Sequence, residues 1–169
     1  MRVLTGLLLS NSTDKKKGML SLKVINEIKC TFPASSRNEG FARSLVSAFS
    51  AQLDPTAGEI GEIKTAVSEA VTNCIVHGYR GCANGSIELV GRILDGNVLY
   101  IKIRDKGCGI EDVKQAMEPL FTSAPEEERA GLGFAVMESF MDKVTVRSAP
   151  NKGTSVIMTR KIPLRSDDT

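Results

Sequence analysis

The apolar positions of this chain first follow a period of two residues, which is the pattern of a half-buried β-strand. They alternate from Leu20 to Phe32, and Pro33 ends the run. Two more apolar runs, 86–94 and 98–104, are separated by an Asp-Gly pair, a strong signal for a β-hairpin. Alternation returns near the end of the chain, on both sides of a glycine-containing turn. The pattern therefore predicts one strand followed by two hairpins.

Elsewhere the apolar period lengthens to three or four residues, as in an amphipathic helix. Ser36 and Glu39 have the spacing of a capping box, which predicts the start of a helix that ends at Asp54-Pro55. The next helix is predicted from about Gly58 to Tyr79. Both helices come after the first strand and before the first hairpin.

Two further helices are predicted between the hairpins. The first is short, at 111–117, and the second spans 131–141 with a glycine-rich first turn. The loop between them, 118–130, contains two prolines and three consecutive glutamates, and we interpret it as a mobile surface segment that could form a lid.

The predicted order of elements is βααββαα followed by ββ, which indicates an α+β fold. Strands joined by tight hairpins favour a mixed, mostly antiparallel sheet with the helices on one face, a two-layer α/β sandwich. We expect one domain at 19–164. Residues 1–18 are interpreted as a disordered leader or tag, and 165–169 as a frayed tail.

Composition indicates an ordinary globular protein and excludes few functions. The chain has 169 residues, 41% of them hydrophobic and 25% charged, with a formal net charge of +2. This charge gives no reason to expect binding to bulk nucleic acid or to an acidic membrane. No apolar run approaches the roughly 18 residues that a membrane helix needs.

The four cysteines lack the paired spacing of a zinc site. Cys30 and Cys74 lie within apolar patterns, which predicts small core residues. Cys82 and Cys108 form no Cys-x-x-Cys pair with them. We therefore expect a reduced, cytoplasmic protein rather than a disulfide framework.

Three polar residues recur at four-residue spacing in the second predicted helix. Glu69, Asn73 and His77 would line one stripe of an α-helix. Glu69 is a candidate general base, and the Asn73 amide oxygen could hold Mg²⁺. The alternatives are an exposed helix glutamate, a solvated asparagine, and a histidine that satisfies the helix C-terminus.

Two glycine motifs follow this stripe in the sequence. Asp105-x-Gly107-x-Gly109 comes directly after a predicted strand, where glycines would let a flat ligand approach the backbone, although a tight turn explains them equally well. Gly131-x-Gly133 opens a helix, where free N–H groups favour an anion such as phosphate. Walker-type and eukaryotic-type kinase motifs are missing from the sequence.

Together these motifs resemble those of the GHKL ATPase superfamily, which includes gyrase, Hsp90, MutL and the histidine kinases. Four stretches carry the resemblance: Glu69…Asn73…His77, Asp105-x-Gly-x-Gly109, Gly131-x-Gly133 and Gly153-Thr154. Longer stretches narrow it to the anti-sigma F factors of spore-forming bacteria, over about residues 20–162. They are 52–56, 63–73, 119–122 and 133–142.

The resemblance implies a GHKL (Bergerat) fold with ATP held between the helix of Asn73 and a lid. By motif position, Glu69 would be the general base for a substrate serine and Asn73 the Mg²⁺ ligand. Asp105 would accept the adenine amino group, supported by Gly109 and Thr154.

The same resemblance implies a phosphate end for the site. Gly131, Leu132, Gly133 and Phe134 would meet the phosphates, and Arg129 would offset the γ-phosphate charge during transfer. His77, Gly107 and Thr122 are the other positions assigned to the nucleotide. One departure is Ala130, which offers only its backbone N–H where relatives can offer a hydroxyl.

For partners, the resemblance implies sporulation sigma factor F, a STAS-type anti-anti-sigma phosphoacceptor and a homodimer, with no nucleic acid or membrane. Glu39 and Arg43, four residues apart, match the first-helix surface that the family uses for partners. Their alternative is a solvated ion pair. The rival functions are an anti-sigma B-type serine kinase and a nucleotide-dependent binding module without significant kinase activity.

Overall fold

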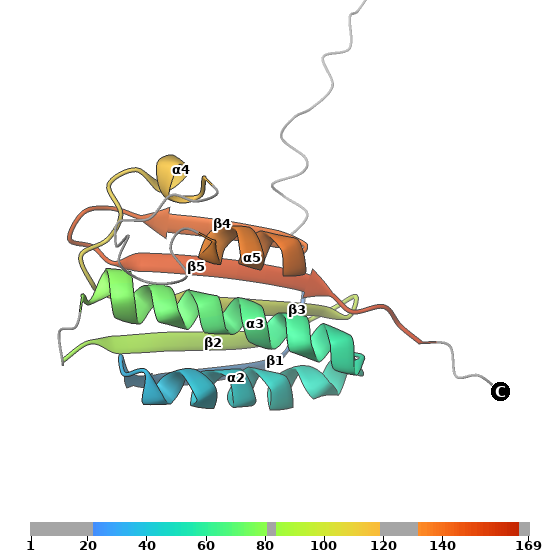
Figure 1. Ribbon diagram of the computed structural model, residues 1–169. Helices are drawn as coiled ribbons and strands as arrows, with labels where there is room; N and C mark the ends of the chain where they lie inside the picture. The colour runs from blue at the N-terminus through green and yellow to red at the C-terminus, as the bar shows by residue number, and fades with distance from the viewer. Residues whose placement is uncertain (1–21, 81–83, 119–131, 166–169) are drawn as a thin grey trace, which may run out of the picture.

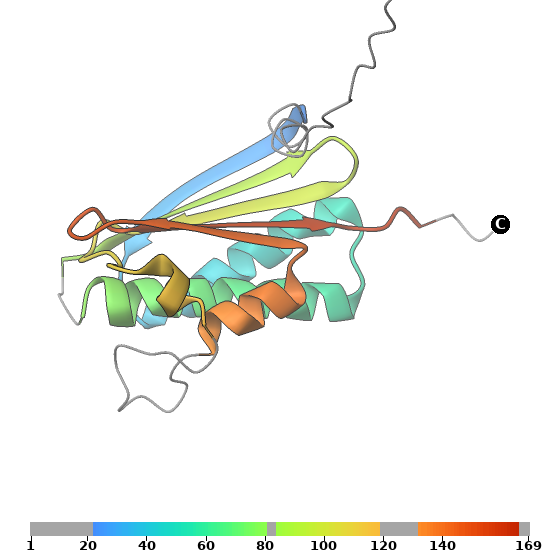
Figure 2. The same ribbon diagram turned by 90° about the horizontal axis from the view of Figure 1, so that it is seen from above.

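The computed structural model of the protein describes residues 22–80, 84–118 and 132–165. These residues form two layers, a sheet and a set of helices that cover one of its faces (Figures 1 and 2). The strands are β1 (Val24–Pro33), β2 (Ser86–Leu94), β3 (Val98–Arg104), β4 (Lys143–Ser148) and β5 (Thr154–Lys161). The helical elements are α2 (Arg37–Ser50), η2 (Ala51–Leu53), α3 (Ala57–Asn73), η3 (Cys74–Gly78), α4 (Val113–Ala116) and α5 (Gly133–Phe140).

The sheet has the order β1-β2-β3-β5-β4, and all four of these described pairings are antiparallel. The predicted α+β class and the single helical face are confirmed, as are both hairpins. Because β5 lies between β3 and β4, the segment that carries α4 and α5 crosses over the sheet between non-adjacent strands. This crossover places α5 beside α3 (Figure 1).

The core lies between the sheet and the helices. On β3 the residues Leu99, Ile101 and Ile103 are fully buried, while the residues between them face the opposite side of the sheet. Ile63 and Val67 of α3 are equally buried. Each such side chain contributes about 1.5–3 kcal/mol relative to an exposed one, so this face fixes the register of the sheet.

The first predicted capping box is wrong, although the helix starts where it was expected. Ser36 is the N-cap of α2, but its backbone is helical (φ −55°, ψ −29°) and its side chain makes no capping hydrogen bond. The Glu39 carboxylate turns instead toward α3, where it accepts a hydrogen bond from the Ser68 hydroxyl, and it pairs with Arg43 at 3.1 Å. The Glu39 side chain is 21% exposed, so this pair links two helices and is not simply solvated.

A reciprocal capping box exists at the next helix, where none was predicted. The Thr56 hydroxyl accepts a hydrogen bond from the Glu59 N–H at 3.0 Å, and the Thr56 N–H donates to the Glu59 carboxylate at 2.7 Å. These bonds satisfy two polar groups at the start of α3. The helix consequently begins at Ala57, one residue before the predicted start.

The end of this helix also differs from the prediction of one regular helix to Tyr79. From Cys74 to Gly78 the backbone widens into a π-helical turn, η3, and the Tyr79 N–H donates to the Cys74 carbonyl at 3.0 Å. The wider turn changes the angle between successive residues. His77 therefore no longer follows the α-helical stripe that Glu69 and Asn73 share.

The remaining elements differ only at their ends. The short helix, α4, is confined to Val113–Ala116, with the Asp112 carboxylate capping it through the Lys114 and Gln115 N–H groups. The predicted leader 1–18 and residues 119–130 of the predicted lid lie outside the described residues, so those interpretations stay predictions. Arg165, at the start of the predicted tail, lies 3.4 Å from the Glu59 carboxylate.

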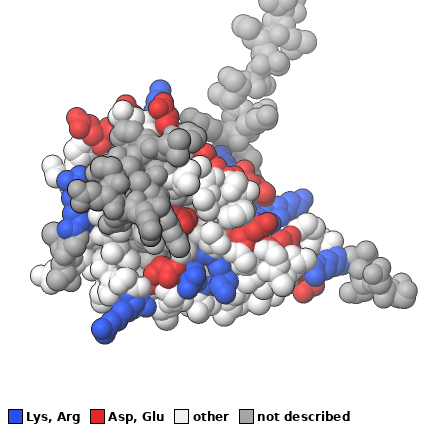
Figure 3. All heavy atoms as spheres, in the orientation of Figure 1, with Lys and Arg blue, Asp and Glu red and all other residues white. Residues whose placement is uncertain are grey.

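Two findings bear on the composition arguments. Cys74 is buried, Cys30 packs against the core, and both are free thiols, as predicted for core residues. No helix among the described residues is long and apolar enough to cross a membrane. Basic and acidic side chains are interspersed over the helix-covered face (Figure 3).

Candidate functional site

Glu69 and Asn73 of α3 lie beside the first residue of α5. A Cβ atom built on Gly133 would be 3.2 Å from the Glu69 carboxylate oxygen Oε2 and 3.2 Å from the Asn73 amide nitrogen. Both side chains are half-buried. Glycine at 133 therefore leaves room for the two polar groups, and the structure brings Glu69 and Asn73 together with Gly133 of the second glycine motif.

Within the ranges that the structure describes, no side chain caps the start of α5. Its N-cap, Leu132, has no side chain that could accept a hydrogen bond, and its own carbonyl accepts from the Val136 N–H at 2.9 Å. The Phe134 side chain packs against the core, so this residue can offer a ligand only its backbone. The helix dipole and the uncapped N–H groups make this end favourable for an anion.

Asp105 is held at the end of β3 by backbone groups. Its side chain is buried, with 1% of the residue exposed, and Oδ1 accepts hydrogen bonds from Gly107 N at 2.8 Å and Thr154 N at 3.2 Å. The Cys74 thiol hydrogen-bonds to the same carboxylate. Burial, reinforced by the charge of Asp105, raises the pKa of that thiol well above its usual value. The carboxylate is thus fixed in place where the sequence predicted it.

The glycines of the first motif are required by the protein's own backbone. A Cβ on Gly107 would lie 2.0 Å from the Gly78 carbonyl oxygen. Gly109 has φ +73°, and a Cβ there would lie 2.0 Å from the Ala149 carbonyl oxygen. The tight turn that was one of the two sequence interpretations is therefore present. The segment that contains Gly107 and Gly109 lies between η3 on one side and the turn that joins β4 and β5 on the other.

Gly153 and Thr154, the last of the four motifs in the sequence, also belong to this arrangement. Gly153 has φ +72°, and its α-carbon approaches the Asp105 carbonyl so closely that a Cβ would be 2.2 Å from that oxygen. The Thr154 hydroxyl lies 3.0 Å from the Ser148 hydroxyl. Three segments that are distant in sequence thus meet around Asp105.

His77 belongs to the same region through its backbone. Its carbonyl oxygen accepts a hydrogen bond from the Cys108 thiol at 3.1 Å, and the neighbouring Gly78 carbonyl accepts from the Cys108 N–H at 2.8 Å. Two hydrogen bonds from Cys108 therefore connect the segment of Gly107 and Gly109 to the π turn η3. The imidazole is half-buried.

Three residues that contribute to this region were not predicted from the sequence. The Tyr79 hydroxyl accepts a hydrogen bond from Lys106 N at 2.9 Å and donates to the Ser86 carbonyl at 2.6 Å. The Ser148 hydroxyl accepts from Ile110 N at 2.8 Å. Gly78 lies against the Asp105 carboxylate, with only 3.1 Å between a built Cβ and its oxygen. A glycine directly after His77 was the one available signal, and it also fits an ordinary helix end.

The remaining predicted positions are not all part of this assembly. Thr122, Arg129 and Gly131 lie outside the described residues. Glu39 and Arg43 lie on α2, and Glu39 alone reaches α3, at Ser68, the residue before Glu69. In the part of the chain that the structure describes, no three His, Cys, Asp or Glu side chains are grouped to hold a metal ion.

A protein-family model described as the histidine kinase-like ATPase domain matches residues 32–160. An anti-sigma F factor of Caldanaerobacter subterraneus subsp. tengcongensis is 56% identical over 137 residues, which cover 81% of this chain and 94% of that protein. The anti-sigma F factor of Thermoanaerobacter sp. strain X514 is 52% identical over 141 residues, covering 83% and 97% respectively.

A solved structure of the RsbU and RsbW domains of a Mycobacterium tuberculosis protein has the same fold. Its TM-score is 0.61 at 17% identity, and the match covers 83% of this chain and 34% of that one. The fold and the site motifs indicate the same family as the two relatives, which are more than half identical to this chain along nearly their whole length. The chain belongs to the anti-sigma F factor family and has a histidine kinase-like ATPase domain.

Proposed function

We propose that this protein binds and inhibits the sporulation sigma factor F and, as an ATP-dependent serine kinase, phosphorylates and inactivates its anti-anti-sigma antagonist. Membership of the anti-sigma F family supports the sigma partner. The observation that carries the kinase proposal is the position of Glu69 and Asn73 beside Gly133, at the uncapped start of α5. A carboxylate, an amide oxygen and an anion-binding helix end meet there.

The described residues fit Mg²⁺-ATP. Mg²⁺ commonly keeps several waters and binds through one or two protein oxygens plus phosphate oxygens, so Asn73 alone is a sufficient protein ligand. The phosphates fit the backbone N–H groups at Leu132, Gly133 and Phe134, and the proposed role of Gly131, which lies outside the described residues, rests on the motif alone. ATP would supply the phosphoryl group, and Mg²⁺ would offset its negative charge.

The adenine end of the nucleotide fits the Asp105 region. The buried carboxylate is a hydrogen-bond acceptor for an exocyclic amino group, and its Oδ1 is oriented by Gly107 N and Thr154 N. Gly109 and Gly153 keep the surrounding backbone close, and His77 closes the region from the helix side. Thr122 would contact the nucleotide from the predicted lid.

Glu69 is the proposed general base. It would accept the proton of the substrate serine hydroxyl as the serine oxygen bonds to phosphorus and the bond to the ADP leaving group breaks. Arg129 would stabilise the charge that develops on the transferred group. Both roles depend on the placement of the two side chains, and neither requires the protein to form a covalent bond with the substrate.

The partner surface is proposed at Glu39 and Arg43. The contact between Glu39 and Ser68 connects this pair to α3, one residue from Glu69. A partner that contacts the pair would therefore sit next to the helix that carries the catalytic carboxylate. We further propose a cytoplasmic homodimer that contacts neither nucleic acid nor membrane.

The test mixes the protein with γ-labelled ATP and small STAS-type candidate proteins and looks for phosphoserine. Glu69→Ala is expected to lower transfer by about 10²–10⁴-fold, because general-base catalysis has that magnitude. Nucleotide binding and sigma binding should stay unchanged, measured by calorimetry on the same sample. Glu138→Ala, an exposed acid on α5, is the matched control and should transfer at the normal rate.

The outcomes separate the rival functions. Undiminished transfer by Glu69→Ala would remove this residue from the mechanism. Sigma binding without any labelled acceptor would favour the nucleotide-dependent binding module. Transfer coupled to a stress-response sigma factor B, but not to sigma factor F, would favour an anti-sigma B-type kinase.

A further inference from the structure

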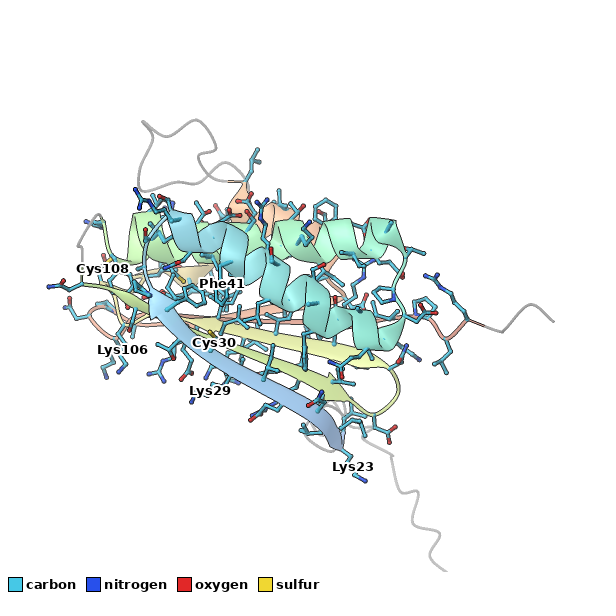
Figure 4. All side chains as sticks on the ribbon, turned by 90° about the horizontal axis from the view of Figure 1, so that it is seen from below. Lys23, Lys29, Cys30, Phe41, Lys106 and Cys108 are labelled. Carbon is cyan, nitrogen blue, oxygen red and sulfur yellow. The ribbon has the colours of Figure 1, made fainter. Side chains whose placement is uncertain are left out.

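The face of the sheet opposite the helices contains a basic hollow. Its volume is about 500 Å³, and it lies over β3, β5 and the end of β4. Four cationic side chains line it: Lys102 and Arg104 from β3, Arg147 from β4, and Lys152 from the turn. Leu99, Ile101 and Ile103 point into the core, so the alternate residues of β3 must point away from the helices. Figure 4 shows another lysine of this open face, Lys29, pointing away from the helices.

The centre of the hollow is a row of three residues in register. Ser155 of β5 pairs with Arg104 of β3 on one side and with Arg147 of β4 on the other. The two arginines are therefore about 10 Å apart at their backbones, two strand spacings. The Ser155 hydroxyl oxygen is buried and has no hydrogen-bond partner. An unpartnered hydroxyl in register between two arginines that line the same hollow offers an oxyanion one hydrogen-bond donor beside two cationic side chains.

The positive charge of this row is offset only in part, by Glu88 of β2, which is in register with Arg104 and whose pKa Arg104 helps to lower after the larger effects of Lys29 and Lys102. Among the described residues, no carboxylate lies within ion-pair distance of Arg104, Arg147 or Lys152. The neighbouring half of the same face is different, because Glu88 lies 3.0 Å from Lys29 and 3.6 Å from Lys102. Arg104, Arg147 and Lys152 are thus the cations of the hollow without an ion pair among the described residues, and the paired charges lie beside them toward β1.

This distribution favours a short acidic peptide segment over nucleic acid. A nucleic acid binds chiefly through a series of phosphate contacts along a basic track, and Glu88 interrupts such a track at β2. A few neighbouring carboxylates need only the area around Ser155. We infer that this hollow is a docking site for an acidic segment of a protein partner, with carboxylates bound by Arg104, Arg147 and the Ser155 hydroxyl.

The site is separate from the proposed nucleotide site but shares a turn with it. Ser148, Gly153 and Thr154 line the hollow, and Gly153 and Thr154 also contact Asp105 from the other side. The proposal does not depend on kinase activity. Its test therefore measures direct binding, and its failure would leave the proposed function unaffected.

The experiment uses the whole protein and a fluorescent oligo-glutamate peptide, with fluorescence anisotropy at low salt. An oligo-glutamine peptide of equal length and a single-stranded DNA oligonucleotide are the comparison probes. We expect binding of the glutamate peptide only, weakening as salt is added. Arg104→Gln and Arg147→Gln should each weaken it about tenfold, because each removes a charge-assisted contact. Ser155→Ala should weaken it to a smaller extent.

Lys23→Gln is the matched control, because it removes one positive charge from an exposed residue before β1 and should change binding less than about twofold. Circular dichroism of each variant checks that the fold is intact. Equal weakening by Lys23→Gln, or equal binding of the glutamine peptide, would overturn the proposal. Tighter binding of the oligonucleotide than of the peptide would overturn the choice of partner.

Discussion

At the scale of single residues, the glycines decide how closely three segments approach. Gly107, Gly109 and Gly153 each place an α-carbon where a side chain would overlap a carbonyl oxygen of another segment. Gly133 differs, because its open side faces the polar groups of Glu69 and Asn73. The first three glycines thus hold the region together, whereas the fourth keeps space beside the candidate catalytic residues.

Gly107→Ala is expected to destabilise the protein by at least the roughly 1–3 kcal/mol typical of overpacking, because its Cβ would lie 2.0 Å from the Gly78 carbonyl. Gly61→Ala is the control. Nothing lies within 4 Å of a Cβ at that α3 position, and alanine is favoured over glycine in a helix by about 1 kcal/mol. Urea unfolding measures both. A Gly107→Ala protein as stable as the parent would contradict the close approach.

At the scale of elements, the two helix starts differ in a way that spacing alone did not reveal. Both Ser36…Glu39 and Thr56…Glu59 have the sequence of a capping box, but only the second forms the reciprocal hydrogen bonds. Glu39 instead contacts Ser68 of the neighbouring helix. A tertiary contact thus replaces the local one.

Thr56→Ala should lower the free energy of unfolding by about 1 kcal/mol, the usual effect of losing an N-cap hydrogen bond. Ser36→Ala should change it by less than about 0.5 kcal/mol, because the exposed Ser36 side chain makes no such bond. Chemical denaturation of the two variants, run in parallel, gives the comparison. Equal losses at both positions would show that Ser36 also caps its helix.

Local patterns predicted most of the fold, and non-local contacts account for the rest. The hairpin of β2 and β3 was readable because Asp95-Gly96 is a turn signal between alternating runs. Nothing local specifies that β5 pairs with β3. The π turn at Cys74 was also hidden, because its residues continue an apolar helical pattern and its stabilising contacts come from Cys108.

The candidate site was only partly readable for the same reason. The spacing of Glu69 and Asn73 placed them on one side of α3, and this holds because the α-helix continues through Asn73. Their neighbour Gly133 was also readable, because a glycine motif at the start of a predicted helix indicates an anion site. The roles of Tyr79 and Ser148 could not be read, because hydroxyl contacts with backbone atoms of distant segments leave no spacing signal.

At the scale of the whole molecule, two carboxylates link segments that are distant in sequence. A backbone hydrogen bond from Thr56 lowers the pKa of Glu59, and Arg165 adds to the effect. A hydrogen bond from Lys29 lowers the pKa of Glu88, which lies between cations of β1 and β3. Both groups are thus more acidic in the folded state than in the unfolded chain.

Stability should therefore fall as the pH decreases below about 4.5, the ordinary value for glutamate, because the unfolded chain then binds more protons than the folded one. Above that pH the contribution of both carboxylates is fully present. Glu88→Gln should make the decrease in unfolding free energy shallower, as measured by urea denaturation between neutral pH and pH 3. The same steepness in the variant and the parent would exclude Glu88 as a contributor.

The strand order has a consequence for how the protein folds. Pairing β5 with β3 brings together residues 49 positions apart, such as Asp105 and Thr154, and the intervening chain contains α4 and α5. Closing a loop of this length is entropically costly, so this pairing is expected to form late. The site around Asp105 includes contacts between the two ends of that loop, in addition to those with η3. The site is therefore completed only when the sheet is completed, and a ligand bound at Asp105 would slow the reopening of the sheet.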